Sequence, residues 1–197
     1  MELVVATSNK GKLCEIKELL KDLPFQITSL ADYPGHPEIV EDGRTFAQNA
    51  LKKASTIAFY TGKLTLGEDS GIEIKALGNK PGIYSARFSG PNATDQKNNQ
   101  KMLRSLRDVP DAQRQARYRC YAALVDKSGI IDVVDGRCSG LITRKARGRN
   151  GFGYDPYFLI KRYDKTFGEL DPQIKAKISH RARALKKIRG VLEKYLK

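Results

Sequence analysis

The chain has 197 residues, of which 40% are hydrophobic and 8% aromatic, and this suits one globular domain with room for two lobes. The formal net charge is +14, from 36 Lys and Arg against 22 Asp and Glu. No apolar run approaches the ~20 residues that span a bilayer, and the start MELVVATSN lacks a signal-peptide pattern. We therefore expect residues 1–197 to form a single cytoplasmic domain that does not bind membranes.

The cysteines indicate the cellular compartment, and the distribution of charge indicates the kind of partner. Cys14, Cys120 and Cys138 are odd in number and widely spaced, which favours reduced thiols in a cytosolic protein. Twelve basic and four acidic residues lie in 161–197, so this segment carries +8 of the +14. Such a surplus attracts nucleic acid or a small phosphorylated ligand, but a solvated basic helix face has the same composition. Charge alone does not choose between them.

The first half of the chain alternates short apolar runs with helical periodicity. An apolar stripe formed by Leu13, Ile16, Leu19 and Leu20 predicts a helix directly after TSNKGK. A longer helix is predicted at Arg44–Tyr60, with Gly62 just past its end. Strands are predicted at Leu3–Ala6, Phe25–Leu30, Leu64–Leu66 and Ile72–Ile74.

The second half is richer in strands. A helix is predicted at Asp95–Arg107, stopped near Pro110, and a last helix at about Arg181–Tyr195. The runs Gln115–Val125 and Ile130–Ile142 flank DKSG and predict a long antiparallel hairpin, and Tyr157–Ile160 predicts a short strand. Helix-connected strands followed by a hairpin indicate an α/β fold with a mixed sheet.

The segment TSNKGK, residues 7–12, joins the first strand to the first helix. A polar, glycine-containing turn at a helix N-terminus presents free N–H groups to an anion, and Lys10 and Lys12 add positive charge. Thr7, Ser8 and Asn9 can bond to phosphate oxygens. The G-x-x-x-x-G-K-[ST] spacing of a Walker A loop is absent, and an ordinary helix cap explains the same residues.

The segment GEDSG, residues 67–71, reads as a polar turn between two strands. Asp69 beside a phosphate site suits a Mg²⁺ ligand, because Mg²⁺ takes few carboxylates plus substrate phosphates. The same carboxylate could activate water as a general base. Glu41 is a second candidate carboxylate for the metal, although an acidic charge at the N-terminus of the next helix is the plainer interpretation.

Two later segments suit nucleotide recognition. In GFGYDPYF, Phe152 stands between glycines, where its ring could stack on a base and Asp155 could bond the base edge; packing on the core is the alternative. In SHRARALKK, Ser179 can cap the last helix, which puts His180 and Arg181 in its first turn. Cations there oppose the helix dipole and suggest a ligand. Lys175 is a candidate phosphate contact.

These segments together resemble the inosine triphosphate pyrophosphatase family. TSNKGK, GEDSG followed by PGIYSARFSG, FGYDP and SHRARAL occur in the family's order and spacing, and the match runs from Leu3 to about Leu192. The resemblance implies a two-lobed α/β fold around a mixed, elongated sheet, with the active-site cleft between the lobes. It implies a homodimer that depends on Mg²⁺ and hydrolyses dITP, ITP and XTP to the monophosphate and pyrophosphate.

The resemblance also implies a role for each matching residue. Asp69 would be the base and a metal ligand, and Glu41 would assist the metal. Lys53 falls where the family has a lysine near the phosphates, and Glu68 stands where many bacterial members carry Asp. The implied substrate-binding residues are Thr7, Ser8, Asn9, Lys10, Gly11, Lys12, Lys53, Ser70, Phe152, Gly153, Tyr154, Asp155, Lys175, His180 and Arg181.

Two rival hypotheses follow from the same residues. A nucleic-acid-binding module would use the basic tail and exposed aromatics, but it leaves Glu41, Glu68 and Asp69 unexplained, because carboxylates repel a phosphate backbone. We therefore expect no nucleic acid partner. A nucleotide hydrolase that releases phosphate instead of pyrophosphate would need the same groups, and only the family resemblance argues against it.

Overall fold

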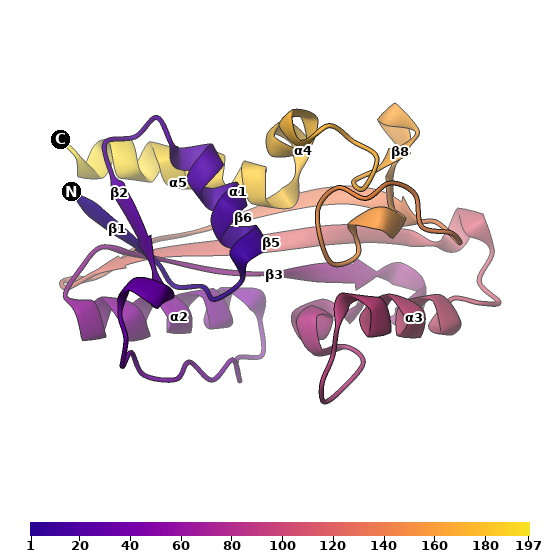
Figure 1. Ribbon diagram of the computed structural model, residues 1–197, viewed down its shortest axis with the longest axis horizontal. Helices are drawn as coiled ribbons and strands as arrows, with labels where there is room; N and C mark the ends of the chain where they lie inside the picture. The colour runs from indigo at the N-terminus through magenta and orange to yellow at the C-terminus, as the bar shows by residue number, and fades with distance from the viewer. The chain divides into compact units, whose positions relative to one another are not determined.

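The computed structural model describes residues 1–197, with five α-helices, eight β-strands and six short 3₁₀ helices (Figure 1). The α-helices are α1 (Lys10–Leu20), α2 (Phe46–Thr61), α3 (Asp95–Ser105), α4 (Pro172–Ile178) and α5 (His180–Tyr195). The strands are β1 (Glu2–Val5), β2 (Gln26–Ser29), β3 (Thr65–Ile74), β4 (Lys80–Pro81), β5 (Gln115–Asp126), β6 (Gly129–Ile142), β7 (Phe158–Ile160) and β8 (Lys165–Thr166). No helix combines the length and apolar character needed to cross a membrane.

The strands form one mixed sheet in the order β2-β1-β3-β5-β6-β7-β8, with β4 paired to β3. β1 pairs in parallel with β2 and with β3, as expected for strands joined through helices. β3–β4, β6–β7 and β7–β8 pair antiparallel. The predicted α/β class with a mixed sheet is therefore confirmed.

The chain divides into two compact units, which confirms the two-lobed organisation. The first unit contains Met1–Asp69, Cys120–Gly136 and Arg181–Lys197, and the second contains Ser70–Arg119 and Arg137–His180. Strands β3, β5 and β6 each contribute residues to both units. The cleft between the lobes stays a prediction.

In the first unit, helices cover both faces of the strands. Alternate residues of β5 separate the two layers: Cys120, Ala122 and Leu124 pack with α1 and α5, whereas Ala123 and Val125 pack with α2. Figure 1 shows α2 on one side of these strands and α1 and α5 on the other. This alternation gives two adjacent residues of a strand access to different helices.

The second unit has its own apolar core. Met102 and Leu106 of α3 pack with Ile72 and Ile74 of β3 and with a group of aromatic residues. That group contains Tyr118, Tyr154, Phe158 and Phe167, and the Tyr118 ring lies 4.7 Å from Phe158 and 6.0 Å from Phe167 between centroids. Because Tyr154 belongs to this cluster, the segment around residue 152 is attached to the core of the second unit.

Most predicted elements are confirmed to within a few residues, including the hairpin β5–β6 and the helices α1, α2, α3 and α5. The prediction of a turn at GEDSG is wrong, because residues 67–71 lie inside the continuous strand β3. Ser179 is the C-terminal cap of α4 and also the residue directly before α5, so its expected role as the cap of α5 stays a prediction. The helix α4 and the two-residue strands β4 and β8 were not predicted.

Candidate active site

Glu68 and Asp69 are adjacent residues of β3 whose side chains point to opposite faces of the strand. Glu68 contacts Lys12 of α1 and Arg181 of α5, whereas Asp69 contacts α2. Both carboxylates are buried, with exposed fractions of 1% and 4%. A buried carboxylate is tolerated when it is paired, and these pairs explain why a polar stretch continues the strand instead of forming a turn.

Gly67 lets this part of β3 lie directly against α2. A Cβ atom at this position would stand 2.2 Å from the backbone oxygen of Ala50 and 2.6 Å from the backbone nitrogen of Ala54. Only glycine fits such a close approach of two backbones. The glycine that suggested a turn therefore brings the next two residues against the helices.

Asp69 belongs to a group of four side chains that we call the carboxylate–lysine cluster: Glu41, Asn49, Lys53 and Asp69. Asn49 Nδ2 donates to Asp69 Oδ2 at 3.1 Å, and Lys53 Nζ lies 3.4 Å from Asp69 Oδ1. Asn49 and Lys53 are one turn apart on α2, which places both on the face that meets β3. Burial raises the pKa of Asp69, and Glu41 raises it further against the opposing effect of Lys53 and Lys12.

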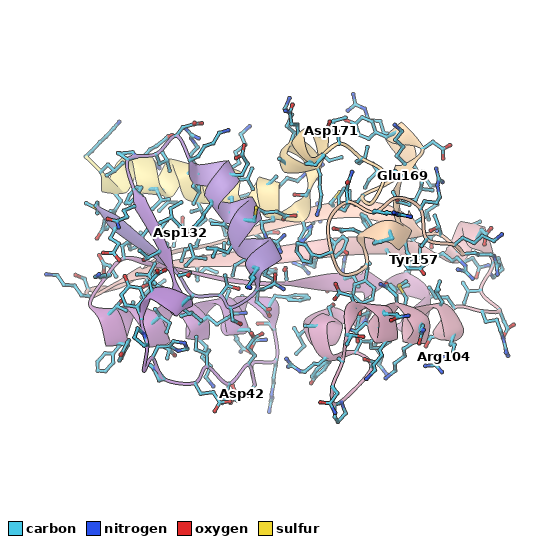
Figure 2. The ribbon with its side chains drawn as sticks, in the orientation of Figure 1. Asp42, Arg104, Asp132, Tyr157, Glu169 and Asp171 are labelled. Carbon is cyan, nitrogen blue, oxygen red and sulfur yellow. The ribbon has the colours of Figure 1, made fainter.

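Glu41 reaches the cluster from the loop before α2, where its Oε1 lies 3.0 Å from Lys53 Nζ. One ammonium group thus contacts two carboxylates, Glu41 and Asp69. Its neighbour Asp42 (Figure 2) instead pairs with Lys52 in a largely exposed ion pair. The oxygens of Glu41 and Asp69 are hard donors of the kind that Mg²⁺ prefers. Mg²⁺ usually binds one or two carboxylates, and water and substrate phosphates fill its remaining positions.

On the other face of β3, Glu68 binds two cations. Its Oε2 lies 2.9 Å from Lys12 Nζ, and its Oε1 lies 3.2 Å from Arg181 NH2 and accepts from Cys120 Sγ at 3.2 Å. The NH1 group of Arg181 pairs with Glu15. We call Lys12, Glu15, Glu68, Cys120 and Arg181 the Glu68 network.

The charges of the Glu68 network support one another. Burial by itself would raise the pKa of Glu68, but Arg181 and Lys12 hold it well below its ordinary value. Burial would also lower the pKa of Lys12, and Glu68 raises it above the usual value instead. Burial, with the nearby Glu68, raises the pKa of the Cys120 thiol. The network is therefore two carboxylates, two cations and a neutral thiol.

The TSNKGK segment forms the turn between β1 and α1. Asn9 caps α1, since its Oδ1 accepts from the backbone N–H of Lys12 at 3.0 Å, and Thr7 Oγ1 accepts from the Asn9 N–H at 3.2 Å. The helix-cap interpretation is thus confirmed. Ser8, Asn9 and Lys10 are exposed, so this helix N-terminus with its lysines is accessible to an anion.

In the second unit, residues 151–155 form what we call the aromatic loop. Asp155 is 2% exposed, and its Oδ2 accepts from the Phe152 N–H at 3.0 Å and from Lys175 Nζ at 2.7 Å. Gly151 has φ +78°, and a Cβ there would stand 2.1 Å from Asp155 Oδ2. Phe152 is half-buried with Lys175 Nζ 5.1 Å from its ring centroid, whereas Tyr154 is buried in the core.

His180 and Ser70 are two further expected substrate-binding residues that belong to the second unit. The His180 ring stacks on Tyr118 with centroids 4.5 Å apart and an interplanar angle of 7°. His180 is 4% exposed. Burial, together with the neighbouring Asp155, raises the pKa of Tyr118 well above its ordinary value and keeps the phenol neutral. Ser70 follows Asp69 in β3 and is half-buried.

A family model describing the Ham1 family matches residues 3–191, nearly the whole chain. This chain belongs to the Ham1 family. Among curated Ham1-type relatives, the "dITP/XTP pyrophosphatase" of Desulforamulus reducens is 48% identical over 194 residues, which cover 98% of this chain and 96% of the relative. That of Geobacter sulfurreducens is 50% identical over 183 residues, 93% of this chain and 92% of the relative.

A solved structure of a Ham1 protein from Coxiella burnetii has a TM-score of 0.89 and 41% identity to this chain. The alignment covers 98% of this chain and 99% of that protein. The resemblance to nucleotide pyrophosphatases that the motifs indicated, and the α/β class, are thereby confirmed at the level of the family.

Several residues of the two clusters escaped the sequence analysis. Asn49 is a polar residue on the apolar face of α2, and its burial on that face is a signal that the sequence contains. Glu15 and Tyr118 carry no such signal, since their partners Arg181 and His180 are distant in the sequence. Only the fold brings these pairs together.

Proposed function

We propose that this Ham1-family protein hydrolyses dITP, ITP and XTP to the monophosphate and pyrophosphate, and so removes deaminated purines from the nucleotide pool. The names of its relatives support this substrate class. The observation that carries the proposal is Asp69, a buried carboxylate held by Asn49 and Lys53 next to a second carboxylate, Glu41.

The reaction needs a water molecule to attack the α-phosphorus. A bond forms between the water oxygen and that phosphorus, and the bond to the oxygen that bridges to the β-phosphate breaks, which releases pyrophosphate. We assign Asp69 as the general base that takes the water proton, a role favoured by its raised pKa. Asn49 fixes the carboxylate by donating to Oδ2.

We propose Glu41 and Asp69 as the residues that hold Mg²⁺. When bound, Mg²⁺ supplies charge neutralisation for the triphosphate. Lys53, which contacts both carboxylates, would turn to the phosphates when the substrate is present. A lysine ammonium on a flexible four-carbon stem can exchange one oxygen partner for another.

The remaining proposed residues bind the substrate. Residues 7–12 would bind the triphosphate through backbone N–H groups and the exposed Lys10, and Ser70 would add a hydroxyl. Lys12, which pairs with Glu68, would turn from that carboxylate to a phosphate. Residues 152–155 with Lys175, His180 and Arg181 would hold the nucleoside. Hypoxanthine and xanthine carry an acceptor oxygen at C6 where adenine carries an amino donor, so the donors of His180 and Arg181 favour the first two bases.

We further propose that residues 1–197 act as one nucleotide pyrophosphatase domain, in the cytoplasm and as a homodimer, and that no nucleic acid is a partner. The exposed N-terminus of α1, next to the lysines of TSNKGK, suits a small triphosphate. The acidic cluster at Asp69 would repel a longer phosphate backbone.

Substitution of Asp69 by Asn tests this assignment. The amide is nearly isosteric, so the protein should fold, but turnover of dITP should fall by ~10²–10⁴-fold because the base is lost. Asp42→Asn, in an exposed ion pair close by in the sequence, is the control and should retain wild-type turnover. If Asp69→Asn released pyrophosphate at more than a tenth of the wild-type kcat, Asp69 would not be the base.

A further inference from the structure

The helix α3 holds both backbone groups of one residue in the aromatic loop. Asp95 Oδ2 accepts from the Gly153 N–H at 2.7 Å, and Asn99 Nδ2 donates to the Gly153 carbonyl at 2.8 Å. Asp95 and Asn99 are one helical turn apart, so they lie on the same face of α3. Two side chains of one helix thus bind the two peptide groups on either side of the Gly153 Cα atom.

The neighbouring Asn98 shows what an ordinary structural asparagine does on this helix. Its Oδ1 accepts from the Ser89 N–H and its Nδ2 donates to the Ala86 carbonyl, so both ends of the amide are bonded. Asn99 is equally buried, at 8% exposed, but its Oδ1 has no hydrogen-bond partner. The hydrogen bond to the Gly153 carbonyl therefore orients the Asn99 amide and holds the aromatic loop against α3.

These contacts decide where the Phe152 ring can lie. The Phe152 N–H is bound to Asp155 on one side, and both groups of Gly153 are bound to α3 on the other. Gly153 itself has φ +62°, a left-handed conformation that glycine adopts without strain. With the backbone held by hydrogen bonds on both sides, the direction in which the Phe152 side chain leaves the loop is set.

We propose that Asp95 and Asn99 are positioning residues that hold the aromatic loop in the conformation in which Phe152 receives a purine. The proposal rests on the proposed function, in which Phe152 stacks on the base. A ring that is placed in advance loses less conformational freedom when the base binds. Loosening the loop should therefore weaken ligands that carry a purine and spare ligands that lack one.

The test compares the binding of dIMP and of inorganic tripolyphosphate by calorimetry in the presence of Mg²⁺. Asn99→Ala and Asp95→Ala should each raise the Kd of dIMP by ~5–10-fold, the usual effect of one hydrogen bond, and leave the Kd of tripolyphosphate within about twofold. Asp95→Asn keeps an acceptor oxygen and should restore dIMP binding. Asn98→Ala is the matched control, because it loses two bonds on the same helix and should still bind dIMP like the wild type.

Three results would overturn the proposal: unchanged dIMP binding in folded Asn99→Ala and Asp95→Ala, an equal loss of affinity for both ligands, or the same weakening of dIMP in Asn98→Ala. If Asn99→Ala does not fold, Asp95→Ala decides, since Asp95 is exposed in the first turn of α3. A wild type that binds dIMP but releases no pyrophosphate from dITP would refute the proposed function and leave this positioning role standing. A wild type that does not bind dIMP would refute both.

Discussion

Replacing Glu68 with Gln removes the charge at the centre of the Glu68 network and keeps its shape. In the wild type, one carboxylate oxygen faces Lys12 Nζ at 2.9 Å and the other faces Arg181 NH2 at 3.2 Å. Glutamine has one oxygen and one NH₂ group, so in either orientation an N–H donor faces a cation. The neutral variant therefore leaves both cations without a countercharge from residue 68 and turns a donor toward one of them.

The expected loss of stability is large. Glu68 is 1% exposed and Arg181 also 1% exposed, so water cannot replace the missing carboxylate at this site. Removing one partner of a buried ion pair destabilises a protein by ~3–5 kcal/mol. For a chain of this size that corresponds to a fall in Tm of roughly 6–20 °C. A total stability of ~5–15 kcal/mol exceeds this loss except at the lowest values of that range.

Urea unfolding followed by far-ultraviolet circular dichroism measures the difference. Glu73→Gln is the matched control, since Glu73 lies in the same strand and pairs with the half-exposed Arg117, for which a loss of ~0–1 kcal/mol is expected. If Glu68→Gln lost no more stability than Glu73→Gln, the Glu68 carboxylate would not be what neutralises the buried cations.

Three further variants test the contact between β3 and α2, the proposed metal ligand Glu41, and the ion pair between Glu2 and Lys63. Gly67→Ala should lose ~2 kcal/mol or more in urea unfolding, because its methyl group would overlap the backbone of α2; wild-type stability would show that the two backbones can separate freely. Glu41→Gln should raise the Mg²⁺ concentration for half-maximal activity, whereas Asp42→Asn should not, and equal Mg²⁺ dependence would exclude Glu41 as a ligand. The hydrogen bond from Lys63 lowers the pKa of Glu2, so this group stabilises the fold above its ordinary pKa and the stabilisation is lost as the pH falls through the lowered value. The stability advantage of wild type over Glu2→Gln should thus be smaller at ~pH 2.5 than at ~pH 6, and a constant gap would contradict this linkage.

The sequence predicts elements whose signal is local. The apolar stripe that includes Ile16 and Leu20 lies within one segment, and so does Gly62 just past the end of α2. The corresponding helices are where the periodicity and the terminating glycine indicate. The helix α4 was missed although Asp171 and Pro172 are a favourable cap and first residue, because seven residues show too little periodicity.

The strand through GEDSG shows why the rest could not be predicted. Its composition is that of a turn, and what keeps it extended comes from elsewhere in the chain: Lys12 and Arg181 for Glu68, and Asn49 and Lys53 for Asp69. The family resemblance placed Asp69 and Lys53 in the same set of residues without showing how they meet. The side chains of Glu68 and Asp69 lie on opposite faces because successive residues of a strand alternate in direction, and residues of a turn do not.

The central claim is the identity of the substrate and of the bond that is cleaved. The most direct measurement assays dITP, ITP, XTP, dATP and dGTP with Mg²⁺ and determines phosphate and pyrophosphate separately. We predict pyrophosphate as the product, with kcat/KM for dITP, ITP and XTP at least ~10²-fold above that for dATP and dGTP. The amino group of adenine leaves buried donors unpaired, whereas guanine shares the C6 oxygen and must be rejected by a second contact near C2. Release of phosphate, or equal kcat/KM for dITP and dATP, would contradict the account.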